Sequence, residues 1–239
     1  MKFTYVKIIV LSSLIFVLSG CMYPNDQLSQ NQVPNEQQLE NVQDAVNQHK
    51  EKTNGLLPIK TKSSDTPIFE KYLIDFTSLR ETNSIGEIPG NAYENGGVYQ
   101  YALIHVEENP QVKLIDLRLT EKIRSINVKL NIYRNKHIYP PFDKEIEDGV
   151  YTIDYEKLDL DAPPVVESPY SGENLPIVMD TMGNLFVDYR VELNTALQDY
   201  EHNYKEGNDI RYILADNTPF LPVYSMPYTI KDGEPVFMN

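Results

Sequence analysis

Residues 120–133, TEKIRSINVKLNIY, decide the fold because two periodicities compete in them. One face of a helix would carry the apolar residues Ile123, Ile126, Leu130 and Tyr133. Within the same stretch, residues 126–132 alternate apolar and polar side chains at every step, which is the period of a strand. We favour a helix, because the stretch is long enough for one and because similar helical patterns lie on both sides of it.

The first of these patterns lies at residues 35–55. Asn35 is a candidate N-cap with Gln38 three residues later, which is a capping-box arrangement, and Gly55 is a suitable stop. The apolar stripe between them consists of Leu39, Val42, Ala45, Val46 and His49. A second stripe ends at Gly207 and consists of Leu193, Ala196, Leu197, Tyr200 and Tyr204. The two stretches therefore predict equivalent helices.

Short patterns between these helices also recur. Residues 74–79, Ile-Asp-Phe-x-x-Leu, return at 153–158 as Ile-Asp-Tyr-x-x-Leu, and each copy is followed by an aromatic strand. We interpret this as a degenerate duplication, with units at 36–106 and 118–191 and a truncated third unit at 192–239. The matches are short and gapped, so chance similarity is the alternative.

Strand signals are clearer than the repeat. Alternating or β-branched runs predict strands at 97–106, 111–118, 150–154, 176–180 and 185–191, with a hairpin turn at 180–184. The predicted class is α+β, built from helix-plus-β-hairpin units in a body that spans residues 36–239.

The N-terminus carries a targeting signal. Lys2 and Lys7 precede an apolar run at residues 8–18 that is shorter than the about 20 residues a membrane-spanning helix needs. The pattern is typical of a signal peptide at residues 1–20. Leu18-Ser19-Gly20-Cys21 then resembles the lipobox of bacterial lipoproteins, which implies cleavage before Cys21 and a diacylglyceryl anchor on its sulfur. A secretory peptide with a chance Cys and a short uncleaved anchor are the alternatives.

The stretch from the lipidated Cys21 to residue 35 is rich in Asn and Gln, contains two Pro and has little to bury, so we expect a disordered tether. A flexible chain of this length extends roughly 20 Å on average. Two acyl chains anchor a protein stably without a basic patch. The predicted location is the outer face of the cytoplasmic membrane.

Composition restricts the partners. The formal net charge is −14, and it becomes −16 after cleavage, because the predicted signal peptide contains two Lys and no acid. Nucleic acid is therefore not expected as a partner, since its affinity depends on neutralising phosphates. Cys21 is the only cysteine, so the chain has neither a disulfide framework nor a thiolate metal site.

Two family resemblances bear on the fold. The order of elements from Val42 to Tyr101, a helix, a Pro- and Asn-rich turn and an aromatic hairpin, resembles the globular part of type II pseudopilins. The long pilin helix and its prepilin cleavage motif are absent, so this resemblance implies a fold and no role. The chain as a whole resembles lipobox lipoproteins of Gram-positive, Bacillus-like bacteria, which implies no activity.

Catalytic motifs are absent from the sequence. There is no Gly-x-Ser-x-Gly, no His-Glu-x-x-His and no phosphate-binding Gly loop, and His49 and His105 are expected in structural roles. Asp75 and Asp154 share an Ile-Asp-aromatic context and could form the paired acids of a glycoside hydrolase. The simpler interpretation is that each Asp caps the turn that follows it.

Two binding hypotheses remain. Residues 143–154 place acids at alternate positions before Gly149, but this spacing misses the EF-hand pattern by one register, so a solvated loop is favoured over calcium. Several tyrosines lie beside prolines and suit either an interaction surface or packing at loop corners: Tyr139, Tyr170, Tyr224 and Tyr228.

The sequence predicts a lipid-anchored, non-enzymatic binding or scaffolding module without cofactor or metal. Its expected partners are the membrane, reached through Cys21, and envelope proteins or cell-wall components. The alternative is a cell-wall glycan or peptide hydrolase that uses the paired carboxylates.

Overall fold

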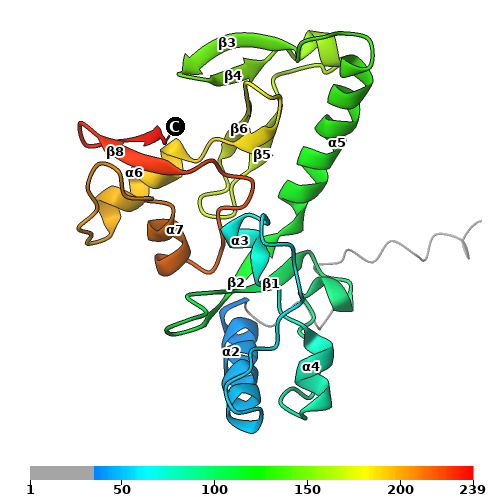
Figure 1. Cartoon of the computed structure of the whole chain (residues 1–239), viewed down its shortest axis with the longest axis vertical. Helices are drawn as coiled ribbons and strands as arrows, with labels where there is room; N and C mark the ends of the chain where they lie inside the picture. Colours follow the sequence, from blue (N-terminus) through cyan, green and yellow to red (C-terminus); the bar gives the residue numbers. More distant parts are fainter. Residues whose placement is uncertain (1–34, 239) are drawn as a thin grey trace, which may run out of the picture.

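A computed structural model describes residues 35–238 (Figure 1). The predicted signal peptide, Cys21 and the tether lie outside the described residues. The helices are α2 (Asn35–Lys52), α3 (Ile68–Lys71), α4 (Phe76–Glu81), α5 (Leu117–Arg134), α6 (Arg190–Asp199) and α7 (Tyr212–Asn217), with 3₁₀ turns η3 (Tyr93–Asn95) and η4 (Glu156–Leu158). The strands are β1 (Tyr99–Ile104), β2 (Gln111–Asp116), β3 (Phe142–Glu147), β4 (Val150–Ile153), β5 (Val165–Glu167), β6 (Asn174–Asp180), β7 (Leu185–Val187), β8 (Tyr228–Lys231) and β9 (Glu234–Phe237). The predicted α+β class is correct.

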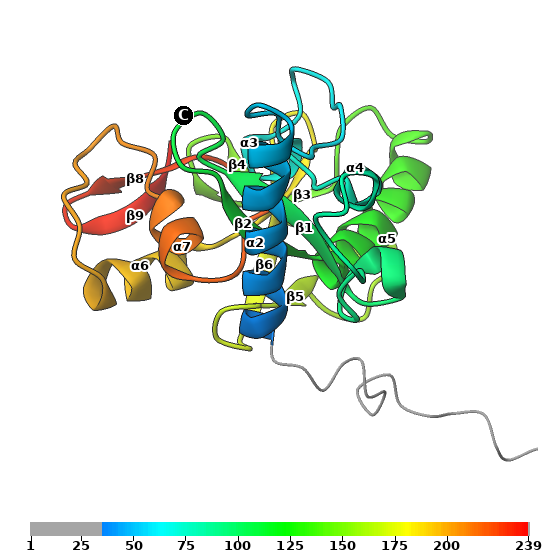
Figure 2. The ribbon, with the colours of Figure 1, turned by 90° about the horizontal axis from the view of Figure 1, so that it is seen from below.

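The β1–β2 hairpin separates two hydrophobic cores. Successive side chains of a strand point to opposite faces, and in β1 Tyr101 and Leu103 join one core while Ala102 and Ile104 join the other. The first core lies under α2 and α4, and α2 crosses the hairpin in the view from below (Figure 2). The second core contains α5, α6, α7 and the remaining strands. Both cores therefore depend on one two-stranded sheet.

Neighbouring segments continue this sheet on both sides. Next to β1, Ile74 N–H donates to Tyr101 O at 2.9 Å. Next to β2, Leu221 N–H donates to Leu114 O at 2.9 Å. The C-terminal part of the chain is thereby attached to the N-terminal unit by backbone hydrogen bonds.

The competing periodicities in α5 are resolved in favour of the predicted helix. Its buried stripe consists of Leu119, Ile123, Ile126 and Leu130. Val128 and Ile132, which give the stretch its strand-like alternation, are 54% and 55% exposed. The alternation therefore arises from apolar residues on the solvent face of a helix, not from strand pairing.

The second half of the chain places an antiparallel sheet of order β3-β4-β6-β5 beside α5, with β7 also paired to β6. The β6–β7 hairpin confirms the predicted turn at 180–184, where the Asp180 carboxylate accepts hydrogen bonds from Met182 N and Asn184 N, both at 2.8 Å. β8 and β9 form a separate hairpin near α6 (Figure 1).

Three helices begin at the same local motif, Asp-x-Arg, at residues 116–118, 188–190 and 209–211. In each copy the Asp carboxylate accepts the backbone N–H of the Arg two residues later, at 2.9–3.1 Å, and pairs with its guanidinium. Such a bond holds the backbone in a turn just before the helix. The motif therefore sets the starts of α5, α6 and α7.

The structure corrects two predicted elements. The strand expected at 185–191 ends at Val187, because Asp188 and Arg190 begin α6. The helix expected to reach Gly207 ends at Asp199. From there the chain turns back to β8, where Ile210 N–H donates to Tyr228 O at 2.9 Å.

The structure repeats one arrangement, a strand followed by Asp-x-Arg and a helix, but at other residues than the predicted duplication. A hairpin, Asp-x-Arg and a helix follow one another at β2–α5 and at β7–α6, so β7 corresponds to β2 and not to β1. α2 packs against β2 and α6 against β9. The duplication with units 36–106 and 118–191 stays a prediction.

Candidate functional site

The two candidate catalytic carboxylates serve as caps. Asp75 accepts hydrogen bonds from Thr77 N at 3.0 Å and Ser78 Oγ at 2.7 Å, at the start of α4. Burial raises its pKa, but these hydrogen bonds outweigh burial and hold the pKa below 3.8. Asp154 lies before η4 and accepts a hydrogen bond from Lys157 N at 3.4 Å. It also pairs with Lys157 Nζ at 2.6 Å, a hydrogen bond that lowers the pKa of its carboxyl. Neither Asp has the raised pKa of a general acid.

The structure does not bring the two carboxylates together. Asp75 caps α4, which lies at one end of the long axis, whereas Asp154 follows β4 at the other end (Figure 1). Retaining and inverting glycosidases require carboxyls about 5–10 Å apart. The structure thus favours the capping role for both residues.

The acidic segment 143–154 is a hairpin, β3 and β4, with Gly149 at its turn. Its acids have protein partners: Glu145 accepts from Tyr151 Oη at 2.9 Å and Glu147 accepts from Phe237 N at 3.1 Å. Within residues 35–238 no group of three or more His, Cys, Asp or Glu side chains is arranged to hold a metal ion. Both glutamates are therefore bound by groups of the protein itself.

The tyrosines beside prolines mainly pack. Tyr228 is fully buried and donates to Val187 O at 3.2 Å, and Tyr170 donates to Phe220 O at 3.4 Å. Tyr139 differs from them, because it is 74% exposed. His49 is also buried, with Nδ1 2.9 Å from Thr82 Oγ1, as expected for a structural residue.

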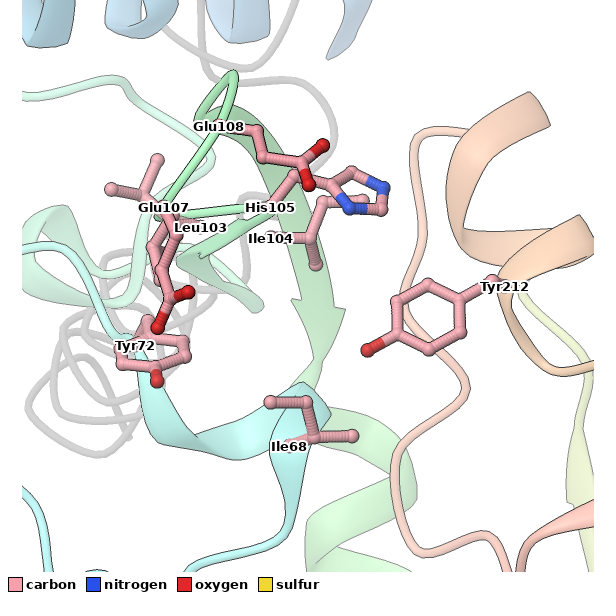
Figure 3. Close-up of a pocket in the computed structure, with 9 residues that line it drawn as sticks. Ile68, Tyr72, Leu103, Ile104, His105, Glu107, Glu108 and Tyr212 are labelled. Carbon is pink, nitrogen blue, oxygen red and sulfur yellow. The ribbon is translucent and has the colours of Figure 1, made fainter. Parts of the chain in front are cut away.

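The strongest candidate site is a pocket of about 240 Å³ where β1 ends (Figure 3). Three segments form it: α3 with the residue after it, the end of β1 with the following loop, and α7. Its lining residues are Ile68, Tyr72, Leu103, Ile104, His105, Val106, Glu107, Glu108 and Tyr212. The sequence places four of them together, His105-Val106-Glu107-Glu108, in the loop after β1.

His105 takes its position because the strand ends there. Its φ is +51°, a left-handed conformation that His tolerates better than most residues. The imidazole Nε2 lies 2.7 Å from the Asp216 carboxylate of α7, and the ring lies 5.6 Å from that of Tyr212. The loop after β1 is thereby connected to α7.

Lys113 of β2 also binds α7, at the C-terminal end of the helix. It is only 7% exposed, and its ammonium donates to Asp216 O at 3.2 Å and Thr218 O at 2.8 Å at the C-terminal end of α7. Burial lowers the pKa of Lys113, and the Asp216 carboxylate opposes this effect. The ammonium binds carbonyls that the helix itself leaves unpaired.

The pocket has an apolar floor, aromatic walls and an acidic rim. Figure 3 shows the Tyr212 hydroxyl pointing from α7 toward Tyr72, with the Glu107 carboxylate near Tyr72 and that of Glu108 near His105. Tyr212 is held by Phe69, with ring centroids 5.2 Å apart. Burial raises the pKa of the Tyr212 hydroxyl above its usual value.

The lining residues include a candidate base, His105, but no hydroxyl or thiol of Ser, Thr or Cys. His105 with Asp216 has the relation of a general base to its orienting carboxylate. No Ser, Thr or Cys is among the residues that line this pocket, and its volume is below the about 300–1,000 Å³ of sites for larger ligands. The arrangement suits the binding of one side chain or a small cation better than cleavage of a polymer.

Sequence reasoning did not find this site. It assigned His105 a structural role, which the bond to Asp216 supports, and it did not single out Asp216, Tyr72 or Tyr212. The cluster of His and two Glu directly after an aromatic strand was the available signal, because functional residues often lie on loops held by rigid elements.

Comparison with known proteins gives one match, which covers the N-terminal part of the described residues. Residues 35–116 match the family model of the YphF family N-terminal domain. The matched stretch runs from the start of α2 to Asp116, the N-cap of α5, and therefore covers the α2 core and the whole β1–β2 hairpin. No curated protein and no solved structure matches the chain. Across residues 35–238 no helix has both the length and the apolar character to cross a membrane.

Proposed function

We propose that this protein is a lipid-anchored, extracytoplasmic and non-enzymatic binding module, whose pocket beside His105 takes a cationic group of another envelope component. The observation that carries the proposal is the pocket itself, which combines aromatic walls with two carboxylates at the rim. The lipobox resemblance at Cys21 supports the anchored location.

A cationic group fits the pocket on two grounds. Ammonium and guanidinium groups are attracted to aromatic faces and to carboxylates. An anionic ligand would be repelled by Glu107 and Glu108.

The size of the pocket indicates the class of partner. A Lys or Arg side chain combines an apolar stem with a charged head, and would place the stem against Ile68 and Ile104 and the head near the glutamates. A pocket for one side chain is typical of a contact within a larger protein–protein interface. We therefore propose an envelope protein that presents a basic residue.

A peptide titration tests the proposal. The chain has no Trp, so a short peptide with one Trp and one Lys reports its own binding by fluorescence anisotropy. We expect binding that weakens at least fivefold in the double variant Glu107→Gln/Glu108→Gln and is unchanged in the control Glu51→Gln/Glu81→Gln, since both control residues are exposed and lie outside the pocket. Equal binding of the same peptide with an acetylated Lys would contradict a cation site.

A further inference from the structure

The charge of the chain is unevenly distributed. Residues 117–139 contain six Lys or Arg and a single acid, Glu121, although the chain as a whole has a formal net charge of −14. The stretch covers α5 and the loop after it. The loop lies at the opposite end of the long axis from α2 (Figure 1).

Several of these cations lack an ion-pair partner. Arg118 pairs with Asp116, and Lys129 donates to the carbonyls of Leu158 and Asp159. Lys122, Arg124, Arg134 and Lys136 are exposed and form no salt bridge with any residue between 35 and 238. Their charges face solvent.

Exposed apolar side chains lie on the outer face of α5, in the loop after it and in the β6–β7 turn, and we call this set the α5 tip. Its members are Val128, Ile132, Ile138, Tyr139 and Met182, exposed by 54%, 55%, 90%, 74% and 68%. Met182 belongs to the β6–β7 turn. This turn lies close to the loop after α5, as shown by Gly183, where an added Cβ would stand 2.8 Å from the Pro140 side chain. Isolated exposed apolar residues are ordinary, but five together among unpaired cations are not.

The arrangement of these side chains is that of an interfacial anchor. Val128 and Ile132 are four residues apart on the outer face of α5, with Arg124 on one side of them and Lys122 and Lys129 on the other. An apolar strip flanked by cations suits the boundary between lipid headgroups and acyl chains. A soluble polyanion would match the cations but would leave Ile138 and Tyr139 in water.

We infer that the α5 tip docks on the surface of an anionic lipid bilayer. Ile138 and Tyr139 enter the headgroup region, and Arg134 and Lys136 contact anionic headgroups. The proposed anchor permits this contact, because the 14 residues from Cys21 to Asn35 can span up to about 50 Å. The acids nearest the tip are Glu156 and Asp159, which line a hollow together with Ile132 and Lys136.

A site-specific probe on the whole purified protein tests this inference. An environment-sensitive fluorophore is attached at Asn135→Cys, beside the tip, or at the control Glu51→Cys on α2. Cys21 is the only native cysteine, so mass spectrometry of each variant shows whether a single label is attached. Each sample is compared on phosphatidylcholine vesicles and on vesicles that also contain phosphatidylglycerol. A lipid anchor would insert into both kinds of vesicle. A difference in emission between them therefore reports contact of the tip with anionic lipid.

We expect the probe at residue 135 to shift to the blue, and to be quenched by spin-labelled lipid, only on vesicles with phosphatidylglycerol. The probe at residue 51 should not respond. The response should be lost in Arg134→Glu/Lys136→Glu and in Ile138→Asn/Tyr139→Ser, and retained in Lys50→Glu/Lys62→Glu.

Three results would overturn the inference. One is the same emission on both kinds of vesicle. Another is a response to soluble polyphosphate without a response to vesicles, which would indicate a wall polymer. The third is a concentration-dependent shift without vesicles, which would indicate self-association.

Discussion

The imidazole Nε2 of His105 lies 2.7 Å from the carboxylate of Asp216, and the pair joins residues 111 positions apart in the sequence. One residue belongs to the N-terminal unit and the other to α7 near the C-terminus. The pocket beside His105 therefore exists only when both parts of the chain are folded against each other.

The His105–Asp216 pair should restrict the motion of the loop after β1, and should contribute little to the unfolding free energy of the whole chain. The His105 and Asp216 side chains are 32% and 40% exposed, and exposed pairs contribute about 0–1 kcal/mol. We expect His105→Asn, which tolerates the left-handed backbone, to change the unfolding free energy within that range. Amide exchange at residues 105–109 should nevertheless accelerate. Unchanged exchange would show that the pair does not hold the loop.

Gly97 should be intolerant of any side chain. A Cβ at this position would stand 2.1 Å from the backbone carbonyl of Asn91, whose side-chain oxygen accepts a hydrogen bond from buried Tyr101 at 2.6 Å. We expect Gly97→Ala to destabilise the chain by about 1–3 kcal/mol in urea unfolding. Gly86→Ala is the matched control, because nothing lies within 4 Å of its Cβ. Equal stability of the two variants would refute the close approach.

His49 should make stability pH-dependent. Burial lowers the pKa of its imidazole below 6.5, against smaller opposing effects of Ser78 and Asp75. The unfolded chain therefore binds a proton at a higher pH than the folded chain, and the unfolding free energy falls as pH drops below about 6.5. Unfolding in urea from pH 7.5 to 5.5 measures this slope. His49→Gln should flatten it, and identical slopes would exclude His49 as the source.

Cys21 should be required for membrane attachment. We expect Cys21→Ser to move the protein from the membrane fraction to the medium, or to stall it as a precursor. Fractionation and mass measurement of the mature protein distinguish these outcomes. Retention in the membrane at the normal mature mass would refute the lipid anchor.

Local chemistry predicted much of the fold. Helix α5 follows from four apolar residues at helical spacing, and the β6–β7 turn follows from Asp180 and Gly183. The start of α6 was missed because the alternating pattern at 185–191 hides Asp188-x-Arg190, although the same motif at residues 116–118 precedes a stretch that was recognised as a helix. The capping roles of Asp75 and Asp154 followed from their position before a turn.

The pocket could not be predicted, because tertiary contacts create it. Tyr72, His105 and Tyr212 come from three distant segments, and no sequence pattern brings them together. The α5 tip differs, since the excess of cations at residues 117–139 is visible in the sequence. The sequence analysis missed the tip because it considered only the net charge of the whole chain, which is negative.

Photo-crosslinking in intact cells tests the binding module most directly. A benzophenone amino acid replaces Tyr72 in the pocket or, as a control, Tyr93, which is 62% exposed on η3. We predict a discrete adduct with another envelope protein from position 72 and none from position 93, lost when Glu107→Gln and Glu108→Gln are introduced. No adduct from position 72, or one that survives both substitutions, would contradict a cation-binding pocket.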